Sequence, residues 1–157
     1  LKTNKVLLDM KGVTLAKTPF GSYLTRCVLE AKSQIFLMCP FIKVDVVDAI
    51  LSKVQRQVEI STLTRLEKTD VVRGLTDVQA LEKLVRRGEV RRNPKVHAKL
   101  LIADDKIALI SSANLSSSGL YYNFECGVLL DEPAIVAQAI FFRRSLERFV
   151  YNHPYED

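Results

Sequence analysis

His97 and Lys99 are the two residues whose types and spacing point most clearly to chemistry. An imidazole can act as a nucleophile, and a lysine two residues further along supplies a cation beside it. Side chains alternate between the two faces of an extended strand, so we expect both residues to point the same way. Such a pair suits a phosphate group, because the imidazole can attack phosphorus while the ammonium neutralises its oxygens.

Ser112 and Asn114 are the next candidates. The apolar residues 107–110 predict a second buried strand, which follows a tight polar turn at 104–106. This strand would carry Ser112 and Asn114 to the end of the hairpin. A hydroxyl and a carboxamide can donate hydrogen bonds to phosphate oxygens, and the paired strands would fix their positions relative to His97 and Lys99.

The complete pattern from His97 to Asn114, H-x-K-x4-D-x6-S-S-x-N, resembles the HKD signature of the phospholipase D superfamily. Members of that superfamily break phosphodiester bonds through a phosphohistidine intermediate. The resemblance extends to Glu125, because a glutamate in this setting holds the catalytic histidine in single-motif nucleases of the superfamily. It implies that Glu125 fixes the tautomer of His97 and raises its basicity, the alternative being a surface carboxylate.

Asp104 also belongs to the signature, but we expect it to be structural. At about 3.3 Å per residue, the strand would place it roughly 20 Å from His97. There it could satisfy backbone groups or a cation near the turn, with direct catalysis as the alternative. Ser111 departs from the usual pattern, in which glycine precedes the Ser-x-Asn, and a side chain there would narrow the pocket.

The mechanism implied by the resemblance needs two copies of the chain. Attack on one side of phosphorus requires protonation of the leaving oxygen on the other side, which one imidazole cannot do. His153 is the only other histidine, and it lies in the tail segment. Single-motif members of the superfamily are homodimers, so we expect a homodimer through the active-site face, with one His97 as nucleophile and the other as acid. Lys99, Ser112 and Asn114 would bind the phosphate, and we expect no metal and no cofactor.

A basic window lies just before this motif. The chain has a net charge of +5, and residues 83–99 contain seven basic residues against one acid, Glu89. Such a concentration attracts polyanions and predicts a nucleic-acid-binding patch, for DNA or RNA. A solvated connection between a helix and a strand is the alternative. The residues assigned to the patch are Arg86, Arg87, Arg91, Arg92 and Lys95.

The chain as a whole suits a single domain. Its 157 residues, of which 48% are hydrophobic, predict one domain over 1–157, either complete or part of a longer chain. No apolar run is long enough to span a membrane, and residues 1–20 do not look like a signal peptide. Three cysteines, Cys27, Cys39 and Cys126, without a close pair are expected to be core residues in a reducing compartment. We therefore expect a cytoplasmic protein for which a membrane partner is unlikely.

The hydrophobic periodicity predicts an α/β layered domain, with a mixed, mostly parallel sheet flanked by helices, which is also the fold that the resemblance implies. Helices are expected over 22–32, from 45 to 54, from 76 to 88 and from 131 to 149. Strands are expected over 35–39, 57–63, 96–102 and 107–110, and from 123 onward.

The first interpretation is thus a metal-independent phosphodiesterase, an endonuclease that cleaves nucleic acid. A phospholipid phosphodiesterase and a non-catalytic nucleic-acid-binding module of a larger protein are the alternatives. A metal-dependent nuclease pattern of Asp9, Glu30 and Lys32 is also present, but it needs a strand where this segment predicts a helix.

Overall fold

The computed structural model describes residues 11–146. Within this range one seven-stranded sheet has the order β1-β7-β6-β5-β2-β3-β4. The strands, in that order, are Val13–Lys17, Cys126–Leu130, Ile107–Ser111, Lys99–Ala103, Gln34–Met38, Glu59–Thr64 and Val90–Arg92. The predicted α/β domain with a mixed sheet is therefore confirmed.

The prediction that the sheet is mostly parallel is wrong. Only the pairs β2–β3 and β3–β4 are parallel, and the pairs β1–β7, β7–β6, β6–β5 and β5–β2 are antiparallel. The turn between β5 and β6 explains part of this result. Asp104 and Asp105 both have positive φ, of 52° and 56°, as a tight hairpin turn requires. A connection this short cannot cross over to a parallel neighbour.

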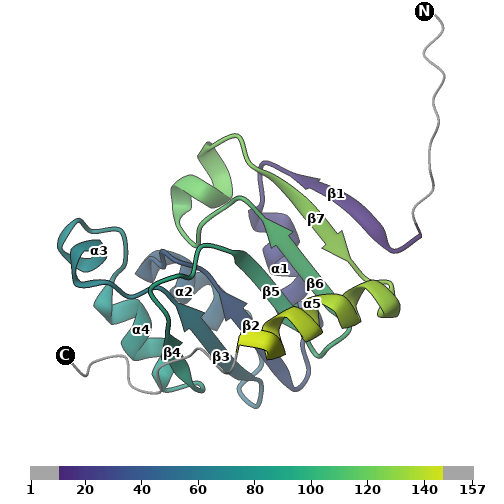
Figure 1. Ribbon diagram of the computed structural model, residues 1–157, viewed down its shortest axis with the longest axis horizontal. Helices are drawn as coiled ribbons and strands as arrows, with labels where there is room; N and C mark the ends of the chain where they lie inside the picture. Colours follow the sequence, from purple (N-terminus) through teal and green to yellow (C-terminus); the bar gives the residue numbers. More distant parts are fainter. Residues whose placement is uncertain (1–10, 147–157) are drawn as a thin grey trace, which may run out of the picture.

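Helices cover the two faces of the sheet unequally (Figure 1). On one face lie α1 (Gly21–Glu30), α2 (Val44–Leu51) and α4 (Val78–Val85). On the other face, among residues 11–146, only α5 (Pro133–Leu146) crosses the strands, in front of them in Figure 1. The short helix α3 (Lys68–Val72) lies beyond the strand ends. No described helix combines the length and the apolar character that crossing a membrane would require.

The alternation of side chains along the central strands gives each face its own core. Leu37 and Leu101 are buried in the larger core beneath α1 and α2, whereas Phe36 and Ile102 pack with Val136 of α5 in the smaller one. Strands with two buried faces read as continuous apolar runs, which is why the sequence predicted them.

The helices and strands differ from the predicted ranges mainly at the ends. β5 begins at Lys99 rather than at 96, so His97 lies in the loop just before the strand. β1, α3 and β4 were not predicted. The predicted end of the last helix near Phe149, and His153, lie outside the described residues.

Candidate active site

The residues of the predicted motif other than Asp104 come together on the side of the sheet that is formed by one set of strand ends, which we call the site edge. β5 begins there, β6 ends there and β7 begins there, because the three neighbouring strands are antiparallel. Lys99 is paired with Ser111, and Ser111 with Gly127. The loop that carries His97, the segment from Ser112 to Asn114 and the residues just before β7 therefore meet at this edge.

Ser112 and Glu125 form the hydrogen-bonded centre of the site edge. The Ser112 hydroxyl donates to Oε2 of Glu125 and accepts a hydrogen bond of 3.2 Å from the backbone N–H of Cys126. The Ser112 N–H donates to the Cys126 carbonyl at 3.0 Å. Asn123 Nδ2 donates to the other carboxylate oxygen of Glu125 at 3.3 Å. These bonds hold the end of β6 against the start of β7.

His97 lies on the surface, and the neighbouring Lys99 is half-buried. The Lys99 ammonium donates to the backbone carbonyl of His97 at 2.9 Å, so the lysine also fixes the loop that carries the imidazole. No hydrogen bond joins His97 to Glu125 in the described part of the single chain. The carboxylate contacts Ser112 and Asn123 instead, and its expected role as the orienting group of His97 stays a prediction.

The buried thiol of Cys39 contacts the carboxamide of Asn114, and the sequence did not predict this contact. The single proton of this thiol is shared between two acceptors, the Phe41 carbonyl at 3.1 Å and Oδ1 of Asn114 at 3.7 Å. The Cys39 sulfur also accepts a hydrogen bond of 3.4 Å from the Leu115 N–H. Burial raises the pKa of the Cys39 thiol to about 11, so the thiol keeps its proton at neutral pH. When Oδ1 of Asn114 faces this donor, the amide hydrogens are left to donate elsewhere.

The three cysteines are free, but they are not all core residues as predicted. Cys27 and Cys39 are buried, whereas Cys126 is exposed. The difference follows from position, because Cys126 is the first residue of β7 and lies at the site edge. Its backbone, not its side chain, takes part in the bonds to Ser112.

Thr18 is a second residue that the sequence did not reveal. Its hydroxyl donates to the Asn123 carbonyl at 2.7 Å and accepts from the Glu125 N–H at 2.8 Å. Its own N–H donates to the Glu125 carbonyl at 3.2 Å. Thr18 follows β1, which pairs with β7, and the missing prediction of β1 hid this contact. The threonine fixes the backbone on both sides of Phe124.

Asp104 lies at the opposite edge of the sheet, where it clamps the connection between α1 and β2. Its carboxylate accepts hydrogen bonds from the N–H groups of Lys32, Ser33 and Gln34 at 2.6 to 2.9 Å, and from the Ser33 hydroxyl at 2.8 Å. Partial burial disfavours its charge, but these donors outweigh that effect and lower the pKa of Asp104 to about 2. These bonds give Asp104 a structural contact at the ends of the strands opposite His97.

The basic window does not form one surface. Arg86 and Arg87 follow α4 at the edge opposite the site edge, where Arg87 donates to the carbonyls of Gln55 at 2.9 Å and Val58 at 3.0 Å. The chain reverses direction between α4 and β4, so these arginines are near the motif in sequence and far from it in space. The prediction of a patch that includes them is therefore corrected.

The other basic residues of the window lie on β4, on the loop that follows it and at the start of β5, apart from Lys83 on α4. Arg91 forms an ion pair of 3.1 Å with Glu89, and Arg92 ends the strand at the site edge. From there residues 93–98 run along the ends of β3 and β2 to β5, anchored by a hydrogen bond of 2.9 Å from Asn93 N–H to the Thr64 carbonyl. Lys95 is exposed on this loop, two residues before His97. The cationic surface beside the motif thus consists of Arg92, Lys95 and Lys99.

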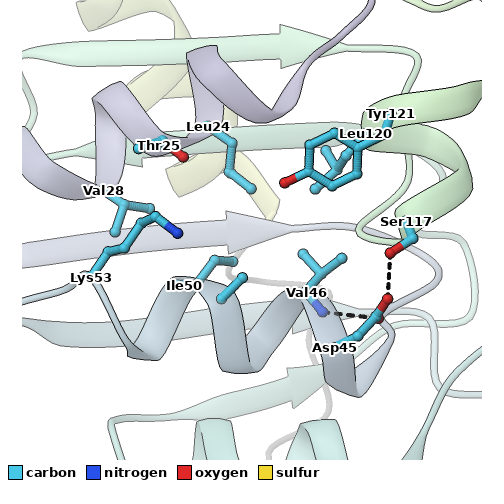
Figure 2. Close-up of a pocket in the computed structure, with 11 residues that line it drawn as sticks. Leu24, Thr25, Val28, Asp45, Val46, Ile50, Lys53, Ser117, Leu120 and Tyr121 are labelled. Carbon is cyan, nitrogen blue, oxygen red and sulfur yellow. Dashed lines mark hydrogen bonds between the residues drawn. The ribbon is translucent and has the colours of Figure 1, made fainter.

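A small cavity of about 80 Å³ lies between α1 and α2, under the π-helical turn η1 (Ser118–Tyr122), as Figure 2 shows. The Ser117 hydroxyl donates to Asp45, whose other oxygen accepts from the Val46 N–H at 2.9 Å. The Tyr121 ring lies beside Leu24, at the α1 side of the cavity. These contacts attach the loop between Asn114 and Glu125 to the helices beneath it.

The two described residues of the metal-dependent nuclease pattern, Glu30 and Lys32, do not lie on a strand. Glu30 lies on a helix, as the sequence predicted, although α1 ends there rather than at Lys32, and it forms an ion pair of 2.9 Å with Arg26 one turn earlier. Asp9 lies outside the described residues.

The fold and the site edge together define a class: an α/β domain that presents a histidine, a lysine and hydrogen-bond donors at one end of a mixed sheet. Residues 24–144 match the family described as cardiolipin synthase, PLD-like domain. The chain therefore belongs to the PLD-like family, within the phospholipase D superfamily, whose members are phosphodiesterases.

Comparison with individual proteins agrees with this assignment. Cardiolipin synthase A of Buchnera aphidicola subsp. Acyrthosiphon pisum is 23% identical over 136 residues, which cover 83% of this chain and 28% of that protein. The structure of Nuc from Salmonella typhimurium, a phospholipase D family member, has a TM-score of 0.73 at 17% identity and covers 90% of this chain and 97% of that chain. NucT from Helicobacter pylori has a TM-score of 0.68 at 16% identity, with 90% and 98% covered. The chain thus spans less than a third of its curated relative and nearly all of the two solved chains.

Proposed function

We propose that this chain is a metal-independent phosphodiesterase that cleaves nucleic acid through a phosphohistidine formed on His97. The observation that carries the proposal is the convergence of His97, Lys99, Ser112 and Asn114 at one sheet edge. The fold likeness to Nuc, a phospholipase D family member, and to NucT supports the proposed type of catalytic domain. The exposed Lys95 and the half-buried Lys99 beside the histidine suit a polyanion.

The reaction proceeds in two displacements. A ring nitrogen of His97 forms a bond to phosphorus while the bond to the leaving oxygen breaks, and that oxygen takes a proton from the partner subunit's His97. Water then attacks phosphorus, gives a proton back to that second imidazole and releases His97 with its electron pair. Lys99 and Asn114 stabilise the charge on the nonbridging oxygens in both steps.

The homodimer that this mechanism requires has a candidate surface on the sheet face that α5 covers incompletely. Leu15, Ile110 and Phe142 are exposed there to 69%, 41% and 44%, and we call them the α5-side patch. Leu15 and Ile110 lie in one row across the sheet, because both are paired with Val128. An open apolar groove of about 280 Å³ runs from Ile110 and Phe142 to Lys99. A second copy seated in this groove would reach the site edge.

The direct test is to trap the covalent intermediate in EDTA. A DNA or RNA oligonucleotide with a labelled scissile phosphate is mixed with the protein, and acid-labile, base-stable label on the protein is measured. We expect label on the wild type, none on His97→Ala, and a loss of rate on the order of 10² to 10³ for Lys99→Ala. Cleavage that stops in EDTA, or that proceeds without any protein-bound phosphate, would contradict the mechanism.

A second candidate substrate is a phospholipid, because the matching family and the curated relative carry the name cardiolipin synthase. Liposomes that contain anionic phospholipid are offered in parallel with DNA and RNA. Release of a lipid head group without cleavage of either nucleic acid would favour this alternative. Binding of nucleic acid without cleavage, unchanged by His97→Ala, would favour a non-catalytic module instead.

The three free thiols fit a reducing compartment such as the cytoplasm.

A further inference from the structure

Two exposed aromatic side chains lie on the loop that separates Asn114 from Glu125. Phe124 is fully exposed (103%) and Tyr122 is exposed to 78%. A phenylalanine with no packing contact is an unfavourable choice for a surface position that has only to remain in water. Phe124 directly precedes Glu125, which bonds to Ser112, so the ring projects from the site edge itself.

The loop holds these rings in fixed places. On one side, Ser117 bonds to Asp45, and Tyr121 packs so closely on α1 that a Cβ at Gly21 would lie 2.2 Å from its ring (Figure 2). On the other side, Thr18 bonds to the backbone of both residues that flank Phe124. A ring on a fixed backbone loses little further freedom when it contacts a ligand.

Two lysines, Lys17 and Lys99, lie at the site edge together with these rings. Lys17 is exposed at the end of β1, where its backbone is paired with Cys126, and it forms no ion pair with any described residue. Lys99 lies at the start of β5, which is separated from β7 by β6. Aromatic rings interleaved with cations are typical of surfaces that stack unpaired bases and follow a phosphate backbone. A duplex cannot offer its bases in this way, because their faces are already stacked inside the helix.

We propose that Tyr122 and Phe124 form a stacking platform for unpaired bases beside the scissile phosphate, so that the preferred substrate is single-stranded nucleic acid. The inference rests on the proposed nuclease function and specifies its substrate class. The platform acts on the nucleotides that flank the reacting phosphate and takes no part in the bond-breaking step.

The test uses two single-stranded oligonucleotides, each with one cleavable linkage. In one, the nucleotides next to that linkage carry bases; in the other, they are abasic. Phe124→Ala and Tyr122→Ala should lower kcat/KM on the base-bearing strand by about 5- to 100-fold each, the range expected for loss of one stacked base. On the abasic strand both variants should match the wild type. Phe124→Tyr keeps a ring and should retain nearly full activity on both strands.

The outcomes separate this inference from the proposed function. Equal losses on the two strands would mean that the rings support the dimer or the fold, and would overturn the platform. Undiminished cleavage of the base-bearing strand by both alanine variants would also overturn it. A wild-type protein that prefers duplex over single strand would do the same. If the wild type cleaves neither strand and hydrolyses phospholipid vesicles instead, the nuclease function fails and the platform fails with it.

Discussion

Asn114 shows how a buried neighbour can decide what an active-site side chain offers to a substrate. A carboxamide can present either its oxygen or its nitrogen, and only the nitrogen donates to a phosphate. The Cys39 thiol, 3.7 Å from Oδ1, favours the orientation that leaves the nitrogen free. We therefore infer that Cys39 is a positioning residue, which acts through Asn114.

Substitution of Cys39 tests this role. Cys39→Val keeps a similar volume but removes the donor, and we expect kcat to fall about 2- to 10-fold with little change in KM, as for the loss of one hydrogen bond. Cys39→Ser restores a donor and should recover most of kcat. Steady-state kinetics on one oligonucleotide measure both effects. Urea unfolding checks that the two variants have similar stability, and equal kcat for valine and serine would refute the role.

Asp104 predicts a pH-dependent contribution to stability. Its pKa is lowered to about 2 in the folded chain from 3.8, so the ionised carboxylate favours folding. This contribution is complete above about pH 4 and disappears as the pH falls through 2. Asp104→Asn should therefore lower the free energy of unfolding at pH 7 by on the order of 1–2 kcal/mol, with a smaller difference at lower pH.

Urea denaturation of both proteins between pH 7 and pH 2.5 measures that difference. Asp105→Asn serves as the matched control, because the neighbouring carboxylate is exposed. A difference between wild type and Asp104→Asn that stays constant as the pH falls would show that the charge of Asp104 is not what stabilises the clamp.

At the residue scale, the sequence predicted the site where types and spacing act locally. Lys99 begins β5 and is paired with Ser111 at the end of β6, so His97 just before β5 and the segment from Ser112 to Asn114 just after β6 are brought together by their offsets. Thr18 could not be predicted, because its contact with Glu125 spans 107 positions of the chain. The prediction of one basic patch was wrong for the opposite reason. Arg86 and Arg87 are close to His97 in sequence, but a reversal of the backbone separates them from it in space.

At the scale of elements, the three antiparallel strands β5, β6 and β7 determine the geometry of the site. They bring Ser112 to Glu125 only if β6 and β7 keep their spacing. Gly127 is the point of closest approach, because a Cβ there would lie 2.1 Å from the Ile110 carbonyl oxygen and 2.8 Å from the Ser111 Cα. Both of these are backbone atoms, which cannot rotate away.

Gly127→Ala should therefore force β6 and β7 apart. We expect a loss of unfolding free energy of about 1–3 kcal/mol and a fall in kcat, because the bond between Ser112 and Glu125 would stretch. Urea unfolding and a cleavage assay measure the two effects. Cys126→Ala is the control in the same strand, because its side chain is exposed and should tolerate the change. An unaltered unfolding curve for Gly127→Ala would show that the sheet can relax around the methyl group.

The elements that the sequence missed share a physical reason. β1 and β4 are the edge strands of the sheet, and edge strands need little apolar alternation. β4 is only three residues long and two of them are arginines. The direction of the strands was also mistaken, although the short connection at Asp104 requires an antiparallel hairpin.

At the scale of the molecule, the incomplete cover of one sheet face predicts the assembly. Ile110→Arg places a charge in the middle of the α5-side patch, and we expect it to shift a dimer to monomer and to reduce cleavage at least tenfold, because the second imidazole is lost. Analytical ultracentrifugation at several protein concentrations measures the first effect. Leu29→Arg is the matched control, since Leu29 is exposed to 52% on α1, on the opposite face. A wild type that is monomeric and fully active would refute the composite site.

The bond between Thr18 and Glu125 also bears on how the molecule assembles itself. The segments that link β5 to β6 (104–106) and β6 to β7 (112–125) are much shorter than the one that separates β1 from β7, so less chain entropy is lost when these strands pair. β1 must instead close a loop that spans most of the polypeptide before it can reach β7. Local contacts form faster than distant ones, so we expect the hairpins around His97 to fold early and the first strand to dock late. His97 would then be in place before Thr18 has formed its hydrogen bonds beside Glu125.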